Sequence, residues 1–219
     1  MPIMKKHDFV EIEYTGRVKE DNTLFDTTQE KVAKESGVYD KDADYGPLII
    51  CIGENNILKA LEEQLIGKET GKEYSIDIIS ASAFGRKDAK LIRLIPLNKF
   101  RQQNIQPFPG LQLNIDGVFG IVKTVSGGRC LVDFNHPLAG KDLVYDVQIN
   151  RLIEDTKEKL KSILRINAQI KDPEIQINES SAEIKLKKNI PKEAETGLKE
   201  MIIRTVPAIK NINFTISQE

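Results

Sequence analysis

The chain has 219 residues, of which 40% are hydrophobic, and its 32 Lys and Arg nearly balance its 33 Asp and Glu, leaving a formal net charge of −1. This length predicts one or two domains, and the hydrophobic fraction is enough for several small cores. Because the charges are balanced and interspersed, the sequence excludes the basic footprint of a nucleic-acid-binding protein and a polybasic membrane patch.

No stretch approaches the ~20 consecutive apolar residues that a membrane-spanning helix needs. The basic residues near the start are not followed by an apolar run, so we expect no signal peptide. The two cysteines, Cys51 and Cys130, match no metal or redox spacing and lie in apolar, strand-like runs, which favours buried free thiols. The sequence therefore predicts a cytoplasmic protein with no membrane or nucleic-acid partner.

Short strands are predicted in the first quarter of the chain. Residues 8–18 alternate, with apolar side chains at every second position from Val10 to Tyr14, which is typical of a half-buried strand. A turn leads to a short apolar segment at residues 24–26. Residues 28–46 are rich in Lys, Glu and Asp and predict a solvated loop, and residues 48–52 predict a short apolar strand.

One short helix follows these strands. Asn55 or Asn56 is predicted to cap it, because a side-chain oxygen there can accept a hydrogen bond from a free backbone N–H. Gly67 suits the left-handed residue that ends a helix. The apolar stripe comprises Ile57, Leu58, Leu61 and Leu65. Alternating residues at 73–79 and 143–149 then predict two more strands, giving a small antiparallel sheet wrapped on the helix.

Between these last two strands lies a segment with strand signals of its own. Residues 89–95 are apolar and extended, and residues 96–100 indicate a turn or a single helical turn. Residues 118–125 and 129–134 flank Ser126-Gly127-Gly128, and such a loop predicts a hairpin because Gly supplies positive φ. We therefore expect an all-β mini-domain here.

The last part of the chain, residues 154–219, shows no repeat of the preceding sequence, and its pattern predicts a separate domain. Its pattern indicates, in order, a helix at 157–166, strands at 175–177 and 182–186, a helix over 194–202 with Pro191 in its first turn, and a strand at 212–216. The order α-β-β-α-β predicts a three-stranded sheet with helices on one face.

Five pieces, in this order, resemble the FKBP-type peptidyl-prolyl isomerases: Val10–Gly16, Leu24-Phe25-Asp26, Gly53–Glu62, Ala83-Phe84-Gly85, and Asn135–Leu143 followed by Val144–Val147. The interruption resembles the SlyD-like branch, in which an insert-in-flap domain replaces a loop over the active site, and the tail is similar to that of archaeal long FKBPs. The resemblance implies an α+β fold with three parts: a discontinuous isomerase domain (1–86 and 135–153), a β-rich insert (87–134) and a C-terminal α-β-β-α-β domain (154–219).

Carried over by position, the resemblance implies a proline pocket lined by Tyr14, Phe25, Asp26, Leu48, Ile57, Leu58, Leu61, Phe84 and Tyr145. It also implies that the Leu58 N–H holds a substrate carbonyl. An X-Pro bond rotates against a barrier of about 18–20 kcal/mol because the twisted amide loses resonance. A ten-thousandfold acceleration needs only about 5.5 kcal/mol of differential stabilisation, so no cofactor or metal is expected.

Other interpretations of these residues stay open. Isolated aromatics such as Phe25 and Phe84 are more often core residues, and Asp26 alone is more often a turn residue. Leu61 stands where many family members have Trp, and Phe84 where many have Tyr, which puts tight binding of macrolide inhibitors in doubt. His136 precedes Pro137 in a turn, and a structural hydrogen bond is favoured there over metal binding, with His7 the only other histidine.

For the insert, the resemblance implies binding of unfolded polypeptide. The apolar candidates are Ile92, Leu94, Ile105, Phe108, Leu111, Leu113, Val118, Phe119 and Ile121, of which about half are expected in the small core. A lid without a binding role is the alternative. An open edge of the C-terminal sheet favours self-association, so a homodimer and a second client-binding surface both remain open.

The sequence thus favours an isomerase that accelerates proline-limited folding and holds unfolded or proline-containing polypeptides through its insert, which raises their local concentration. Two alternatives remain. One is a holdase chaperone with weak or no isomerase activity, and the other is a dimeric assembly scaffold. Joint retention of the predicted pocket residues favours the enzyme; these are Tyr14, Phe25, Asp26, Ile57, Leu58 and Tyr145.

Overall fold

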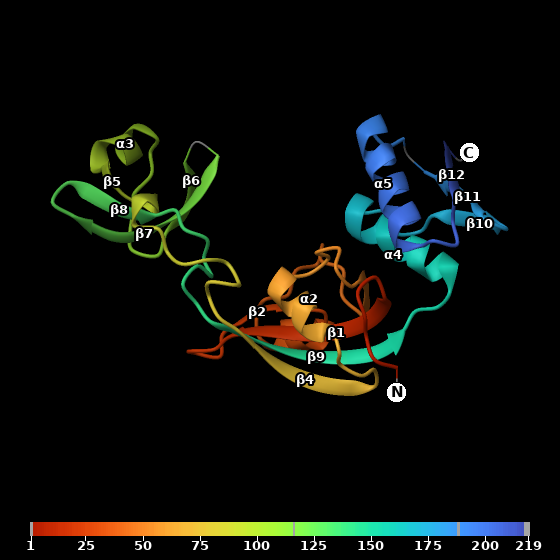
Figure 1. Ribbon diagram of the computed structural model, residues 1–219. Coiled ribbons are helices and arrows are strands. Elements are labelled where there is room, and N and C mark those ends of the chain that lie inside the picture. The colour runs from red at the N-terminus through yellow and green to blue at the C-terminus, as the bar shows by residue number, and fades with distance from the viewer. Residues whose placement is uncertain (1, 116, 188, 217–219) are drawn as a thin grey trace. The chain divides into compact units, whose positions relative to one another are not determined.

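The structure, a computed structural model, describes residues 2–115, 117–187 and 189–216, and the chain forms two compact units (Figure 1). The first unit comprises Met1–Ile78 and Val144–Glu219. The second, called the insert unit below, comprises Ile79–Leu143. Sheets of mostly antiparallel strands and a few helices build both units, which agrees with the mixed α and β composition that the sequence predicts.

A five-stranded sheet forms the first half of the first unit. Its strands are β1 (Phe9–Val18), β2 (Leu24–Thr27), β3 (Leu48–Cys51), β4 (Lys72–Ile78) and β9 (Leu143–Leu152). The order is β2-β1-β9-β4, and β3 also pairs with β1. The antiparallel β1–β2 pair places Gly16 opposite Asp26, while β3 pairs with the other end of β1, where Val10 lies opposite Ile50. Helix α2 (Lys59–Leu65) contacts β4 and lies across the sheet in Figure 1.

The alternation in the sequence explains how this sheet is covered. Val10, Ile12, Val147 and Ile149 are fully buried, as are Leu61 and Leu65 of α2 on the helix stripe. Phe9 is buried as well, although it points to the opposite face of β1 from Val10. It can do so because the C-terminal elements cover that face.

These C-terminal elements are α4 (Thr156–Ala168), β10 (Glu174–Asn178), β11 (Ser181–Leu186), α5 (Lys192–Thr205) and β12 (Asn211–Ile216), in the predicted order. Strand β11 pairs antiparallel with β10 and parallel with β12. Their buried side chains form one hydrophobic cluster that also contains Phe9 and Cys51. The division of the chain at residue 154 stays a prediction, because both sides contribute to this cluster.

The insert unit has its own four-stranded sheet in the order β5-β8-β7-β6. Its elements are a 3₁₀ turn (Ala89–Leu91), β5 (Ile92–Pro96), α3 (Leu97–Gln102), β6 (Gln112–Ile115), β7 (Val118–Ser126) and β8 (Arg129–Asp133). The predicted β7–β8 hairpin is confirmed, and Gly127 and Gly128 both have positive φ, +56° and +71°. The helical turn that the sequence allows at residues 96–100 is present as α3, which buries Phe100 against the sheet, so the description of this segment as all-β is wrong.

Two further expectations are corrected. The predicted loop at 28–46 contains a short helix, α1 (Glu30–Glu35), which buries Ala33 and carries a Glu30–Lys34 ion pair of 2.6 Å. Helix α5 begins after Pro191, which is its N-cap residue and does not lie in the first turn. The two cysteines, by contrast, are buried and free as predicted.

Candidate active site

Tyr14, Phe25, Asp26 and Tyr145 lie together where β1, β2 and β9 run side by side. The Tyr14 hydroxyl donates a hydrogen bond of 2.9 Å to Asp26 Oδ2. The Tyr145 ring makes edge-to-face contacts with Tyr14, at a centroid distance of 5.8 Å, and with Phe25, at 5.6 Å. Such edge-to-face pairs are the favoured geometry of aromatic rings. Asp26 is exposed, so a carboxylate stands at the border of an apolar, aromatic surface.

Gly16 allows the Phe25 and Tyr145 rings to pack directly against the backbone of β1. A Cβ at this position would lie 2.7 Å from Phe25 Cζ and 2.9 Å from Tyr145 Cε1, distances that real Cβ atoms do not adopt. The two rings therefore occupy the space above the β1 backbone because residue 16 has no side chain. Gly16 ends the Val10–Gly16 motif, but no role for it could be predicted from the sequence.

Both tyrosines of the cluster stay protonated over the whole physiological range. Burial raises the pKa of Tyr14 above its ordinary value, and the Asp26 carboxylate raises it further by its charge and by accepting the hydroxyl proton. Burial, and then the Asp26 charge, raises the pKa of Tyr145 in the same direction. Tyr145 is only 4% exposed, whereas Tyr14 and Phe25 are half-buried. The cluster therefore offers a ligand parts of the Tyr14 and Phe25 rings and the neutral Tyr14 hydroxyl.

The segment before α2 is held by a buried carboxylate. Glu62, only 2% exposed, accepts hydrogen bonds from the backbone N–H groups of Gly53 (2.9 Å), Asn55 (3.1 Å) and Asn56 (3.1 Å). The prediction that Asn55 or Asn56 caps the helix is wrong. Leu58 is the N-cap residue and has no side-chain hydrogen bond, and Asn56 Oδ1 accepts the N–H of Cys51 instead.

The remaining predicted pocket residues in the first unit differ in exposure. Leu48, Ile57 and Leu58 are half-buried, so part of each side chain faces solvent. Leu61 is fully buried and can support a pocket only from beneath. The Leu58 N–H has no hydrogen-bond acceptor among the residues that the structure describes, which leaves it available to a ligand.

Phe84 belongs to the insert unit, where its ring stacks on His136 at a centroid distance of 4.3 Å. The Leu138 N–H donates to His136 Nδ1 at 3.2 Å, the structural hydrogen bond that the sequence predicts for this histidine. Within the described ranges, no group of His, Cys, Asp and Glu side chains is placed to hold a metal ion. In the same part of the chain, no helix is long and apolar enough to cross a membrane.

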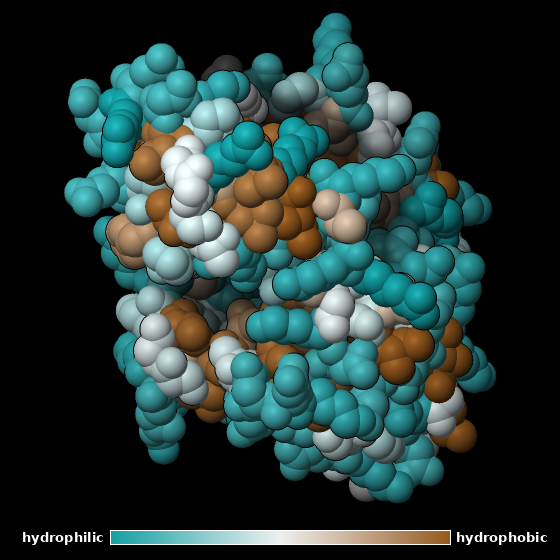
Figure 2. Space-filling view, turned by 90° about the vertical axis from the view of Figure 1, so that its left-hand side faces the viewer, coloured by the Kyte–Doolittle hydropathy of each residue, from teal (hydrophilic) through white to brown (hydrophobic). Residues whose placement is uncertain are grey.

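The predicted client-binding residues of the insert differ in their exposure to solvent. Leu94, Phe108, Val118 and Phe119 are exposed. Ile105, Leu111 and Leu113 pack against the small core formed by Phe100, Val122, Cys130 and Val132, while Ile92 and Ile121 are half-buried. On the face that Figure 2 shows, apolar side chains form several patches, each bordered by hydrophilic side chains.

Comparison with known proteins decides the family. The "Short-type peptidyl-prolyl cis-trans isomerase" of Methanocaldococcus jannaschii is 31% identical over 147 residues, which cover 67% of this chain and 92% of that protein. This chain belongs to the FKBP-type peptidyl-prolyl cis-trans isomerases. The FKBP-type isomerase SlyD of Vibrio cholerae is 26% identical over 64% of this chain and 72% of its own length. A probable FKBP-type 16 kDa isomerase of Pseudomonas fluorescens is 32% identical over 50% of this chain and 75% of its length.

The insert matches a family model of its own. The model "FKBP26, IF domain" covers residues 93–138 of this isomerase. The predicted membership of the insert-in-flap FKBPs is thereby confirmed. A solved structure, the N-terminal domain of FKBP42 from Arabidopsis thaliana, covers 70% of this chain and 79% of its own at 13% identity and a TM-score of 0.37, too low for a shared fold to be concluded from it.

Proposed function

We propose that this isomerase accelerates proline-limited folding of polypeptide chains, with the aromatic cluster of the first unit as its active site. The observation that carries the proposal is the arrangement of Tyr14, Phe25, Asp26 and Tyr145 around Gly16. Leu48, Ile57, Leu58 and Leu61 are the further proposed site residues. Phe84, which lies in the insert unit, stays a prediction from the resemblance.

The chemistry that this cluster can perform is desolvation and orientation. A planar X-Pro amide is stabilised by polar solvent, and its twisted form has less charge separation. An aromatic surface that excludes water therefore disfavours the planar form relative to the twisted one. The Leu58 N–H would fix the substrate by one carbonyl, while Asp26 orients the Tyr14 hydroxyl at the edge of the site.

The insert unit is proposed to hold the unfolded client. Leu94, Phe108, Val118 and Phe119 expose large apolar side chains, which an unfolded client would cover on binding. Strands β5 and β6 end the sheet, so each offers an edge to an extended chain. The homodimer through the C-terminal sheet and the cytoplasmic location both remain predictions.

Refolding of an unfolded, proline-limited protein and isomerisation of a short proline peptide test the proposal together. We expect the intact chain to accelerate both reactions. Replacing residues 87–134 by a short loop should remove most of the effect on the protein but not on the peptide. Asp26→Ala should lower both rates by about ten- to a hundredfold, since a hydrogen bond to a charged group contributes roughly 1.5–3 kcal/mol.

Asp77→Ala is the matched control, because Asp77 is an exposed carboxylate that pairs with Lys19 on the same sheet. It should leave both rates unchanged. An intact chain that suppresses aggregation but accelerates neither reaction would refute the isomerase proposal and leave a holdase. A loop variant as active on the protein as the intact chain would refute the role of the insert.

A further inference from the structure

The chain is nearly neutral as a whole, but its basic and acidic residues are unevenly distributed between the insert unit and the rest. Residues 79–143 contain nine Lys and Arg but only four Asp and no Glu. The rest of the chain has the opposite excess, with 23 Lys and Arg against 29 Asp and Glu. The insert unit is therefore basic, and its ligand meets a positive potential that total composition does not indicate.

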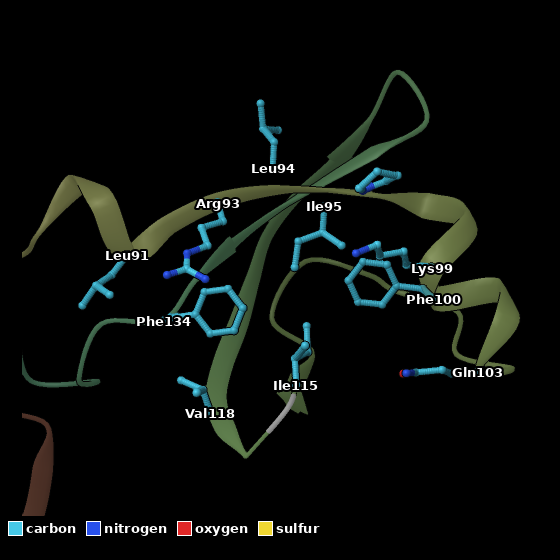
Figure 3. A pocket seen from close by; sticks show the side chains of 11 residues that line it. Leu91, Arg93, Leu94, Ile95, Lys99, Phe100, Gln103, Ile115, Val118 and Phe134 are labelled. Carbon is cyan, nitrogen blue, oxygen red and sulfur yellow. The ribbon is translucent and has the colours of Figure 1, made fainter.

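A cavity of about 570 Å³ lies beside β5 and α3 of the insert unit (Figure 3). This volume is in the range of ligand-binding pockets, which are mostly apolar with a few polar groups. Its lining comprises Leu91, Arg93, Leu94, Ile95, Pro96, Lys99, Phe100, Gln103, Ile115, Val118 and Phe134. Two cations and one amide are the only polar side chains in that set.

Arg93 and Ile95 extend from the same side of β5 into the cavity, toward Phe134 and Phe100, whereas Leu94 extends from the opposite side (Figure 3). The Arg93 guanidinium lies 5.8 Å from the centre of the Phe134 ring. Lys99 enters from α3. A segment seated in this cavity would therefore contact aromatic and aliphatic surface with cations at two places.

Both cations are exposed, and neither forms an ion pair with a carboxylate among the described residues. Lys87 of the same unit differs, since it pairs with the buried Asp133 at 3.3 Å. Cations without a carboxylate partner in the described part of the chain, placed over an apolar lining, are electrostatically complementary to a ligand that carries negative charge next to apolar groups. The terminal strand β5 adds a free edge for an extended backbone.

We propose that this cavity selects extended apolar polypeptide segments that carry acidic side chains, and disfavours segments flanked by basic ones. The inference deepens the proposed function, on which it rests, by naming the class of client. Nucleic acid is the less suitable occupant, because Phe100 is 3% exposed and Arg93 lies over Phe134, so neither ring is free to stack on a base.

The test uses the full chain and three labelled peptides of about eight residues, long enough to lie along β5 as a strand. Each has the same Val, Leu and Phe centre without proline, and carries Asp, Asn or Lys pairs at its ends. At about 0.01 M salt, where the Debye length is ~30 Å, we expect the Asp peptide to bind about tenfold more tightly than the Lys peptide. At about 1 M salt the difference should vanish.

The double variant Arg93→Gln with Lys99→Gln should lose the preference and bind the Asn peptide as the wild type does. Lys90→Gln with Lys123→Gln is the matched control, since it removes the same charge from exposed positions outside the lining. It should keep the preference. An equal loss of preference in both double variants would overturn the cavity as the origin and leave only general basic character.

The remaining outcomes separate the inference from the proposed function. Equal binding of all three peptides to the wild type would overturn the selectivity while preserving client binding by the insert. Binding of none would refute client binding itself, and the inference with it. An oligothymidine that displaces the Asp peptide from wild type, but not from the cavity variant, would reassign the cavity to nucleic acid.

Discussion

Gly16 shows how one missing side chain sets the geometry of the proposed active site. The Phe25 and Tyr145 rings occupy the volume that a Cβ would need, and Tyr145 in turn contacts Tyr14. The orientation of three aromatic rings therefore depends on a residue that has no side chain of its own.

Gly16→Ala is expected to move both rings, because a methyl group inserted into a close-packed site forces displacement at a cost of about 1–3 kcal/mol. We expect the free energy of unfolding to fall by this amount in a denaturant titration, and the rate of peptide isomerisation to fall about tenfold. An alanine variant with wild-type stability and rate would show that the rings do not depend on this contact.

Gly197→Ala provides the matched control. Gly197 lies within α5, and a Cβ there would meet nothing within 4 Å. Because Ala is the better helix former, this variant should gain roughly 0.5–1 kcal/mol in stability and keep its activity.

The residues of the aromatic cluster could be predicted from the sequence, but the structural roles of Gly16 and Glu62 could not. The family resemblance brought out Tyr14, Phe25, Asp26 and Tyr145, which the structure places in mutual contact. The roles of Gly16 and Glu62 were missed because each acts through a residue distant in sequence or through backbone groups, and no spacing pattern encodes such a contact. Whether these side chains bind substrate stays a prediction.

At the scale of elements, the loop before α2 is held by Glu62, a residue in the first turn of that helix. One buried carboxylate accepts three backbone N–H groups of the preceding loop, which leads directly to Ile57 and Leu58. Such charge-assisted bonds are stronger than neutral ones, and their loss leaves buried donors unsatisfied.

Glu62→Gln should therefore cost about 2–4 kcal/mol of unfolding free energy, because a neutral amide replaces a carboxylate that bonds three donors. It should also raise KM for a proline peptide more than it lowers kcat, since the loop that carries Ile57 and Leu58 loosens. The neighbouring Glu63 is exposed and forms an ion pair with Lys59. Glu63→Gln should change stability by less than about 0.5 kcal/mol, and equal effects at both positions would contradict the assignment.

Strands and helices whose apolar residues recur at regular spacing, or form a continuous run, could be predicted from the sequence. Elements without such a pattern could not. Strands β4 and β9 bury every second residue over part of their length, and α4 and α5 bury residues along one side. Helix α1 was missed because only Ala33 of its six residues is buried, so it has no stripe to recognise. Strand β6 was missed because its four residues include only two apolar ones, Leu113 and Ile115, whereas β3, of the same length, is a continuous apolar run.

For the whole molecule, the main finding is that the C-terminal elements complete the core of the first unit. Phe9 and Cys51 of the five-stranded sheet lie in the same cluster as Leu160, Ile163 and Ile202 of α4 and α5. Arg204 of α5 also binds Glu54, whose side chain is only 7% exposed, through Nη2 at 2.5 Å. A local periodic pattern predicts each element, but it cannot predict which elements share a core.

A chain that ends at residue 153 should thus be strongly destabilised, although it retains the proposed active-site residues. Uncovering Phe9 and Cys51 alone costs roughly 3 kcal/mol, since each buried apolar side chain contributes about 1.5–3 kcal/mol. We expect the thermal unfolding midpoint of this truncated chain to fall well below that of the full chain. Replacing residues 87–134 by a short loop is the control, and it should leave the midpoint of the first unit unchanged because the insert has a separate core.

The two free cysteines make the opening of each unit measurable, because each unit contains one of them. Cys51 is buried in the first unit and Cys130 in the insert unit, and burial raises the pKa of Cys51 to about 12. A thiol reagent therefore reaches each sulfur only when its own unit opens. Each unit thus contains one cysteine whose modification rate reports the opening of that unit. Comparison of the two rates shows whether the units open independently or together.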